Sequence, residues 1–112
     1  MGNSTVTKYN NVSAFSGTPK ECDHHLLFGN GLRTLADEDG LTIPLLHREH
    51  NLSPKGTIYQ IHGNPAAEKL SKIAGQLAWE RNYLIEKYQM PFDDLSEEAR
   101  SAFRKRYGIS FL

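Results

Sequence analysis

The pattern of apolar and polar positions differs between the two halves of the chain. Up to residue 50, short apolar runs are separated by glycines and prolines, and the clearest runs cover residues 22–28 and 41–46. Runs of this length, bounded by turn residues, predict two short strands. Residues 32–37 between them fit a single helical turn. We therefore expect a small β-hairpin in the first half of the chain.

Beyond residue 63 the apolar positions follow helical spacing instead. Asn64 is a suitable cap for a helix whose first residue is Pro65, a position that tolerates proline. Apolar residues then recur at intervals of three and four, which predicts one buried helix face over residues 65–87. The residues of this predicted face are Leu70, Ile73, Ala74, Leu77, Ala78, Tyr83 and Leu84.

A second helix is predicted at the C-terminal end of the chain. It should begin near Ser96, carry acidic residues in its first turn and basic residues in its last turn, and end at Gly108. This order of charges complements the helix dipole. Together the patterns predict an α+β fold.

Composition restricts the classes of function. With 112 residues the chain forms one small domain. Basic and acidic residues both number 13, so the net charge is zero and any basic surface must be local. The sequence shows neither a membrane-spanning run nor a signal peptide, so we expect a cytoplasmic protein. The single cysteine, Cys22, excludes an internal disulfide and an all-cysteine zinc site.

The histidines are the main candidates for chemistry, because all 5 lie between residues 24 and 62. Neutral imidazole binds metals and acts as a general base near neutral pH. His24 and His25 are neighbours, and neighbours on a strand point to opposite faces. A strand end would let both approach one site from different sides, with one residue as ligand and the other as base. The alternative for such a pair alone is a surface position.

A second cluster follows downstream. His47 and His50 are three residues apart, Asn51 offers an amide oxygen to a hard cation, and His62 directly precedes the capped helix. Each of these residues alone is compatible with a solvated loop. Their joint occurrence predicts that the two clusters meet around one divalent metal.

The order of these motifs resembles the HNH nucleases of the ββα-metal type, and most of all the small single-domain versions from bacteriophages and prophages. The resemblance begins with His24-His25-Leu26 before a glycine and continues with a strand rich in Leu and Ile. His50-Asn51 and Ile61-His62-Gly63-Asn64 follow, and the similarity extends through residues 67–72, 75–80 and 102–108. It covers most of residues 21–112.

The resemblance implies a β-hairpin and a helix folded around one metal site, with additional C-terminal helices. It divides the chain into a loose N-terminal arm at 1–15 and an HNH-like nuclease domain at 16–112. By position His25 would be the general base and His24 a metal ligand. His50, Asn51 and His62 compete to complete the metal shell, and we favour His50 and His62. The cofactor would be one divalent ion, namely Mg, Mn, Ni or Zn.

The function implied is a metal-dependent DNA endonuclease or nickase, acting in the cytoplasm of a bacterial host cell. Arg33, Arg48 and Lys55 are the candidates for DNA contact, because they lie near the histidines in sequence. Since a neutral domain should bind DNA weakly by itself, a homodimer or other phage proteins are further expected partners, and a membrane is not.

Two other functions compete with cleavage. The middle Asn of the HNH pattern has no clear match, which motivates a catalytically inactive HNH-like protein that binds DNA or assists phage packaging or recombination. In the other alternative the histidines and Cys22 hold a structural zinc, so that chelation would unfold the chain.

Overall fold

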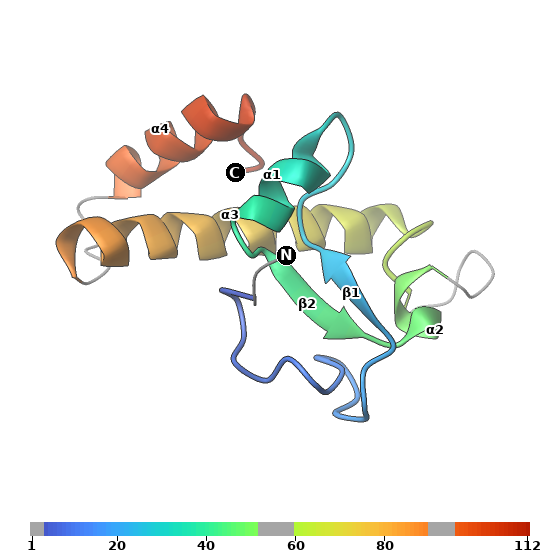
Figure 1. Cartoon of the computed structure of the whole chain (residues 1–112). Helices are drawn as coiled ribbons and strands as arrows, with labels where there is room; N and C mark the ends of the chain where they lie inside the picture. The colour runs from blue at the N-terminus through green and yellow to red at the C-terminus, as the bar shows by residue number, and fades with distance from the viewer. Residues whose placement is uncertain (1–3, 52–59, 90–95) are drawn as a thin grey trace.

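The computed structural model describes residues 4–51, 60–89 and 96–112 and confirms an α+β fold that contains a hairpin. Figure 1 shows the long helix α3 with the hairpin beside its first half and α4 beside its second half. The elements in order are β1 (Cys22–His25), α1 (Leu32–Glu38), β2 (Thr42–Leu45), α2 (His47–His50), α3 (Pro65–Tyr88) and α4 (Ser96–Tyr107). No described helix is long and apolar enough to cross a membrane.

The hairpin pairs β1 with β2 in an antiparallel and regular register. His24 lies opposite Ile43, and His25 lies opposite Thr42. Beyond the strands, the Leu26 amide still donates to the Leu41 carbonyl at 2.9 Å. Both strands are shorter than predicted, because the flanking leucines leave the sheet and enter the interior. In a regular register successive side chains alternate between faces, so His24 and His25 point to opposite sides of β1.

Residues 4–15 run along the hairpin and α2. The Ser4 hydroxyl donates to the Thr42 carbonyl at 2.6 Å, and the Thr5 amide donates to the Gly40 carbonyl at 2.8 Å. Ser13 is buried, and its hydroxyl donates to Glu49 Oε1 at 2.6 Å. These contacts attach a segment predicted as a loose arm, while the division into 1–15 and 16–112 stays a prediction.

Helix α3 begins and ends close to the predicted positions, but the face predicted to be buried is confirmed only in part. Leu84 is buried and Ala78 packs against the core, as predicted. Leu70 and Leu77 are exposed, at 65% and 49% of their surface. The buried positions are Ser71, Gly75, Gln76, Glu80 and Leu84. The hairpin passes so close to α3 that a Cβ on Gly75 would lie 3.0 Å from side-chain atoms of Leu26 and Leu27. Small residues therefore face the hairpin, and Leu70 and Leu77 turn outward.

The hydrophobic core lies between α1, α3 and α4. Phe103 of α4 is fully buried and stacks on Tyr107, with ring centroids 4.5 Å apart. Trp79 of α3 meets the Phe103 ring edge-on at 5.7 Å. The buried cluster consists of Leu27, Leu32, Ala36, Leu41, Phe103 and Tyr107.

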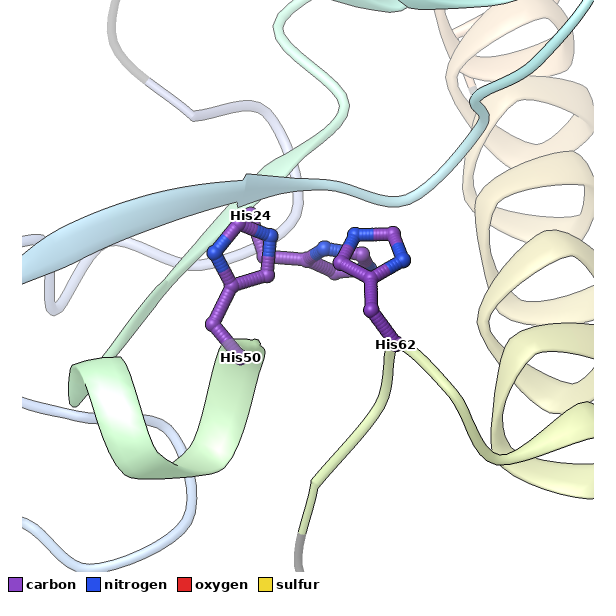
Figure 2. A group of neighbouring side chains, drawn as sticks. All are labelled: His24, His50 and His62. Atoms are coloured by element: carbon purple, nitrogen blue, oxygen red, sulfur yellow. The ribbon is translucent and has the colours of Figure 1, made fainter. Parts of the chain in front are cut away.

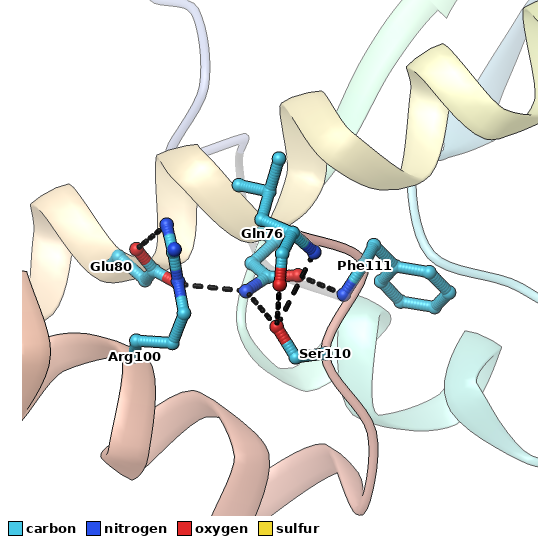
Figure 3. Close-up of polar contacts among 6 residues, drawn as sticks. Gln76, Glu80, Arg100, Ser110 and Phe111 are labelled. Carbon is cyan, nitrogen blue, oxygen red and sulfur yellow. Dashed lines mark hydrogen bonds and ion pairs between the residues drawn. The ribbon is translucent and has the colours of Figure 1, made fainter.

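Hydrogen bonds of the buried Gln76 side chain attach the C-terminal residues to α3 (Figure 3). Gln76 Oε1 accepts the Phe111 amide at 2.6 Å, and its Nε2 donates to Glu80 at 2.8 Å and to the Ser110 hydroxyl at 2.9 Å. Arg100 of α4 pairs with the same Glu80 at 3.1 Å. Because the side-chain groups of Gln76 are hydrogen-bonded, its burial at a helix–helix contact is compatible with stability.

Asp39 links the end of α1 to both long helices. Its carboxylate accepts from Trp79 Nε1 at 3.0 Å, from Arg106 Nε at 2.7 Å and from the Tyr107 hydroxyl at 2.6 Å. Burial and the hydrogen bond to Asp39 raise the pKa of Tyr107 well above its ordinary value, so the hydroxyl remains a donor. Arg106, from the basic run that ends α4, is thus used inside the fold.

We predict that Asp39→Ala lowers the free energy of unfolding by about 2–4 kcal/mol, because it leaves several partly buried donors unpaired. Chemical denaturation measures this change. Glu38→Ala is the matched control, because that side chain is 60% exposed and, among the described residues, its ion pair is with Arg106 at 3.4 Å. The control should change the free energy by at most about 0.5 kcal/mol. Equal effects of the two substitutions would contradict the linking role of Asp39.

Candidate metal centre

Backbone pairing brings the two downstream histidines together. The Ile61 amide donates to the Glu49 carbonyl at 3.0 Å, and the His62 amide donates to the His50 carbonyl at 2.9 Å. The segment before α3 is thereby held against α2. His50 is the last residue of α2 and His62 lies just before the cap of α3, so both rings project into the same space.

Glu49 fixes the short helix α2 from the inside. The residue is buried, and its carboxylate accepts the Leu46 amide at 2.8 Å as well as the Ser13 hydroxyl. A helix of 4 residues has little stability of its own, so this buried carboxylate supplies the anchor that orients His50.

Figure 2 shows the imidazoles of His24, His50 and His62 converging from β1, from α2 and from the segment before α3. The ring centroid of His24 lies 5.0 Å from that of His50 and 5.2 Å from that of His62. The His50 and His62 centroids are 4.7 Å apart. One ring nitrogen of each lies within 4.8 Å of the others, close enough to hold a metal ion. The structure thus brings together the three histidines favoured as ligands, which we call the three-histidine group.

The hydrogen bonds of Ser71 determine which nitrogen of His24 is protonated. The Ser71 hydroxyl lies 2.8 Å from the Leu26 carbonyl and 2.8 Å from His24 Nε2. A carbonyl only accepts, so the hydroxyl donates to Leu26 and accepts from His24 Nε2–H. His24 Nδ1 then carries a lone pair, and this atom is buried with no partner in the described part of the chain.

The other two imidazoles also have one nitrogen engaged outside the group. His62 Nδ1 lies 3.3 Å from Glu68 Oε2, and His50 Nδ1 lies 3.8 Å from the sulfur of Cys22. A carboxylate or thiol at the outer nitrogen sets the tautomer and orientation of a ligating imidazole. By elimination, Nε2 of each ring faces His24 Nδ1.

The donors fit a divalent metal of borderline softness. Three neutral imidazoles with a further position open is the arrangement of catalytic zinc sites. Two nitrogens bound at about 2.1 Å to one ion lie at most about 4.2 Å apart, so the group needs a small inward movement of the rings. Cys22 lies outside the three-histidine group, and its sulfur faces the outer nitrogen of His50 instead.

Burial keeps the imidazoles of His24 and His50 neutral. Desolvation, followed by the neighbouring His50 and His62, lowers the pKa of His24 to about 3. Desolvation and His62 likewise lower the pKa of His50 to about 4. At neutral pH both rings therefore keep a lone pair available for a metal.

We predict that the metal-free protein loses stability as the pH falls below about 6.5. The unfolded chain then protonates His24 and His50, whose ordinary pKa is 6.5, while the folded chain keeps both neutral. The free energy of unfolding should be about 2 kcal/mol lower at about pH 5.5 than at about pH 7.5. Denaturation in a chelator measures this. His50→Gln should remove about half of the dependence, and an unchanged pH profile in that variant would contradict the assignment.

We predict that Ser71→Ala weakens binding of Zn²⁺ by about 10–100-fold, because His24 loses the partner that fixes its tautomer and ring orientation. Competition with a chromophoric chelator measures the affinity. Ser101→Ala is the control, since Ser101 is an exposed serine on α4. Equal zinc affinity in the Ser71 variant and the wild-type chain would exclude the orienting role.

His25 points away from this group, toward α1. Its Nε2 lies 2.9 Å from Asp37 Oδ1, and Arg33 Nε donates to its Nδ1 at 3.4 Å. Because the carboxylate accepts, Nε2 carries the proton and Nδ1 carries the lone pair. These three residues, with Thr34 and Glu38, line a cavity of about 290 Å³. His25 still lies close enough to contribute to the lowered pKa of His24 and His50.

The remaining predicted site residues are placed less tightly. Asn51 follows His50 at the end of α2 and is exposed, and its role as a ligand stays a prediction. Arg48 is exposed on α2. Lys55 lies outside the described residues. Sequence reasoning missed Ser71, Glu68 and Asp37; a serine within the apolar pattern of α3 was the one signal available.

Comparison with protein family models, with curated proteins and with solved structures finds no match to this chain. The arrangement of the site is therefore the basis on which a function can be assigned.

Proposed function

We propose that the protein is a metal-dependent DNA endonuclease or nickase of the HNH type. The observation that carries the proposal is the buried, unpartnered His24 Nδ1, which faces two further imidazoles whose outer nitrogens are engaged. A buried polar atom without a partner is costly unless something binds it. A metal ion held by His24, His50 and His62 removes that cost.

Imidazole donors favour zinc or nickel over magnesium, which prefers oxygen ligands. When bound to the three histidines, the ion would supply Lewis-acid stabilisation of the phosphate and of the leaving 3′-oxygen. Three ligands rather than four among the described residues support a catalytic over a purely structural ion.

His25 is the proposed general base. Asp37 holds the proton on Nε2, so Nδ1 can accept a proton from the attacking water. Arg33, at 3.4 Å from that nitrogen, would bind a phosphate oxygen when DNA enters the cavity. As the water oxygen bonds to phosphorus, its proton passes to His25 and the bond to the 3′-oxygen breaks.

A protein that binds DNA without cleaving it is the second candidate. The same Arg33 contact favours it, because Nε donates to the nitrogen that a base must keep free. In that case the metal orders the fold around the site, and the DNA is recognised but not hydrolysed.

We predict that supercoiled plasmid is nicked or cut when Zn²⁺, Ni²⁺, Mn²⁺ or Mg²⁺ is added, and that His25→Ala lowers the rate by at least about 100-fold. Asp37→Asn should also lower the rate, because the carboxylate that holds the proton on His25 Nε2 is lost. Gel electrophoresis of plasmid forms over time and pH measures both effects.

His47→Ala is the matched control, because His47 is an exposed histidine on α2 outside the group. Full activity in His25→Ala would exclude the base. Retarded migration of DNA without cleavage in all four metals would favour the binding protein. Loss of the folded state upon chelation, without cleavage in any metal, would indicate a structural zinc.

A further inference from the structure

We propose that Lys69 and Lys72 of α3 form a phosphate-binding surface for one DNA strand beside the three-histidine group. We call these two residues the α3 lysine pair. The inference rests on the proposed function and names residues that position its substrate.

Phe28 connects Lys72 to the histidines. The Phe28 ring lies edge-on to His62 at 4.7 Å and to His24 at 5.7 Å, measured between centroids. Lys72 Nζ lies 4.7 Å from the centroid of the same ring. The ammonium group is therefore separated from the imidazoles by a single aromatic side chain. Lys72 also lies one helical turn after Glu68, whose carboxylate contacts His62.

The Phe111 ring lies close to both Lys69 and Lys72. Lys69 Nζ lies 5.2 Å and Lys72 Nζ 5.7 Å from the centroid of the Phe111 ring. Phe111 is itself held by Gln76, which accepts its backbone amide (Figure 3). Since residues three apart share a helix side, the two rings direct both ammonium groups to one patch of surface.

The charge of the α3 lysine pair is not compensated. Within the described ranges neither Nζ has a carboxylate at ion-pair distance, whereas Lys87 of the same helix pairs with Glu98 at 2.7 Å and Lys20 pairs with Asp23 at 3.0 Å. Two ammonium groups gathered around one ring repel each other, so a bound anion would stabilise them. The backbone of DNA offers anions in a row, which suits two cations on one helix side.

The α3 lysine pair would supply a local positive charge that attracts DNA. The chain has no net charge, so attraction to DNA must come from local cations beside the site. Contacts from the α3 lysine pair to phosphates flanking the cleaved bond would place that bond against His24, His50 and His62. Such contacts position the strand and carry no sequence information.

The test is binding of a fluorescein-labelled DNA duplex, followed by anisotropy in EDTA so that no cleavage occurs, from about 50 to 200 mM NaCl. Lys69→Gln with Lys72→Gln should weaken binding by on the order of tenfold per lysine at the lowest salt. The negative slope of log K against log salt should become less steep by about 0.9 for each phosphate that is no longer neutralised. Lys72→Arg should retain binding, because it keeps the cation.

Lys87→Gln is the matched control, being a lysine of the same helix that also lies over aromatic rings but is paired with Glu98. Zinc affinity should stay at the wild-type value in the double variant, which shows that Phe28 and the histidines are undisturbed. A wild-type slope in the double variant, or an equally weakened binding in Lys87→Gln, would overturn the inference while leaving cleavage by the wild-type chain intact. Tighter wild-type binding to an RNA duplex, weakened in the same way by the double variant, would overturn the assignment to DNA. Absence of both binding and cleavage in the wild-type chain would instead refute the proposed function.

Discussion

The Ser71 hydroxyl is the contact on which the geometry of the site depends. It bridges the Leu26 carbonyl at the end of the hairpin and His24 Nε2, both at 2.8 Å, and it comes from the buried side of α3. One hydroxyl therefore satisfies a carbonyl beyond the strand, fixes the tautomer of a buried histidine and sets the position of the helix. The close approach at Gly75, one turn later, makes this bridge possible, because any longer side chain there would move α3 outward.

The site also depends on the alternation of side chains along β1, which sends His24 and His25 to opposite faces of the strand. The two residues are neighbours in the sequence, yet one ring meets His50 and His62, while the other meets Asp37 and Arg33 of α1. A phosphate served by both must therefore lie across the edge of β1. The helix inserted between the strands supplies Asp37, whose carboxylate accepts from His25 Nε2 at 2.9 Å and orients that imidazole.

Periodicity predicted the elements of this fold but not its faces. Strand positions, the cap at Asn64 and the extent of α3 follow from local preferences that are visible in the sequence. The buried face of α3 does not, since Leu70 and Leu77 have the spacing of core residues and yet are exposed. Which face is buried depended on the approach of the hairpin, a tertiary property. For the same reason the histidines were predictable as a set, whereas their partners Ser71 and Glu68 were not.

The candidate metal site combines neutral imidazole ligands with charged side chains around them. Burial lowers the pKa of His24 and His50, so these two rings stay uncharged at neutral pH. A divalent ion bound by imidazoles would keep its full charge, which carboxylate ligands would partly neutralise. A phosphate would then meet a site with a strong local positive charge in a chain whose net charge is zero. Lys69 and Lys72 would add to that field, because neither pairs with a carboxylate of the described residues. The Glu68 carboxylate lies at the outer nitrogen of His62, so it orients that ring and would leave the charge of a bound ion available to the substrate.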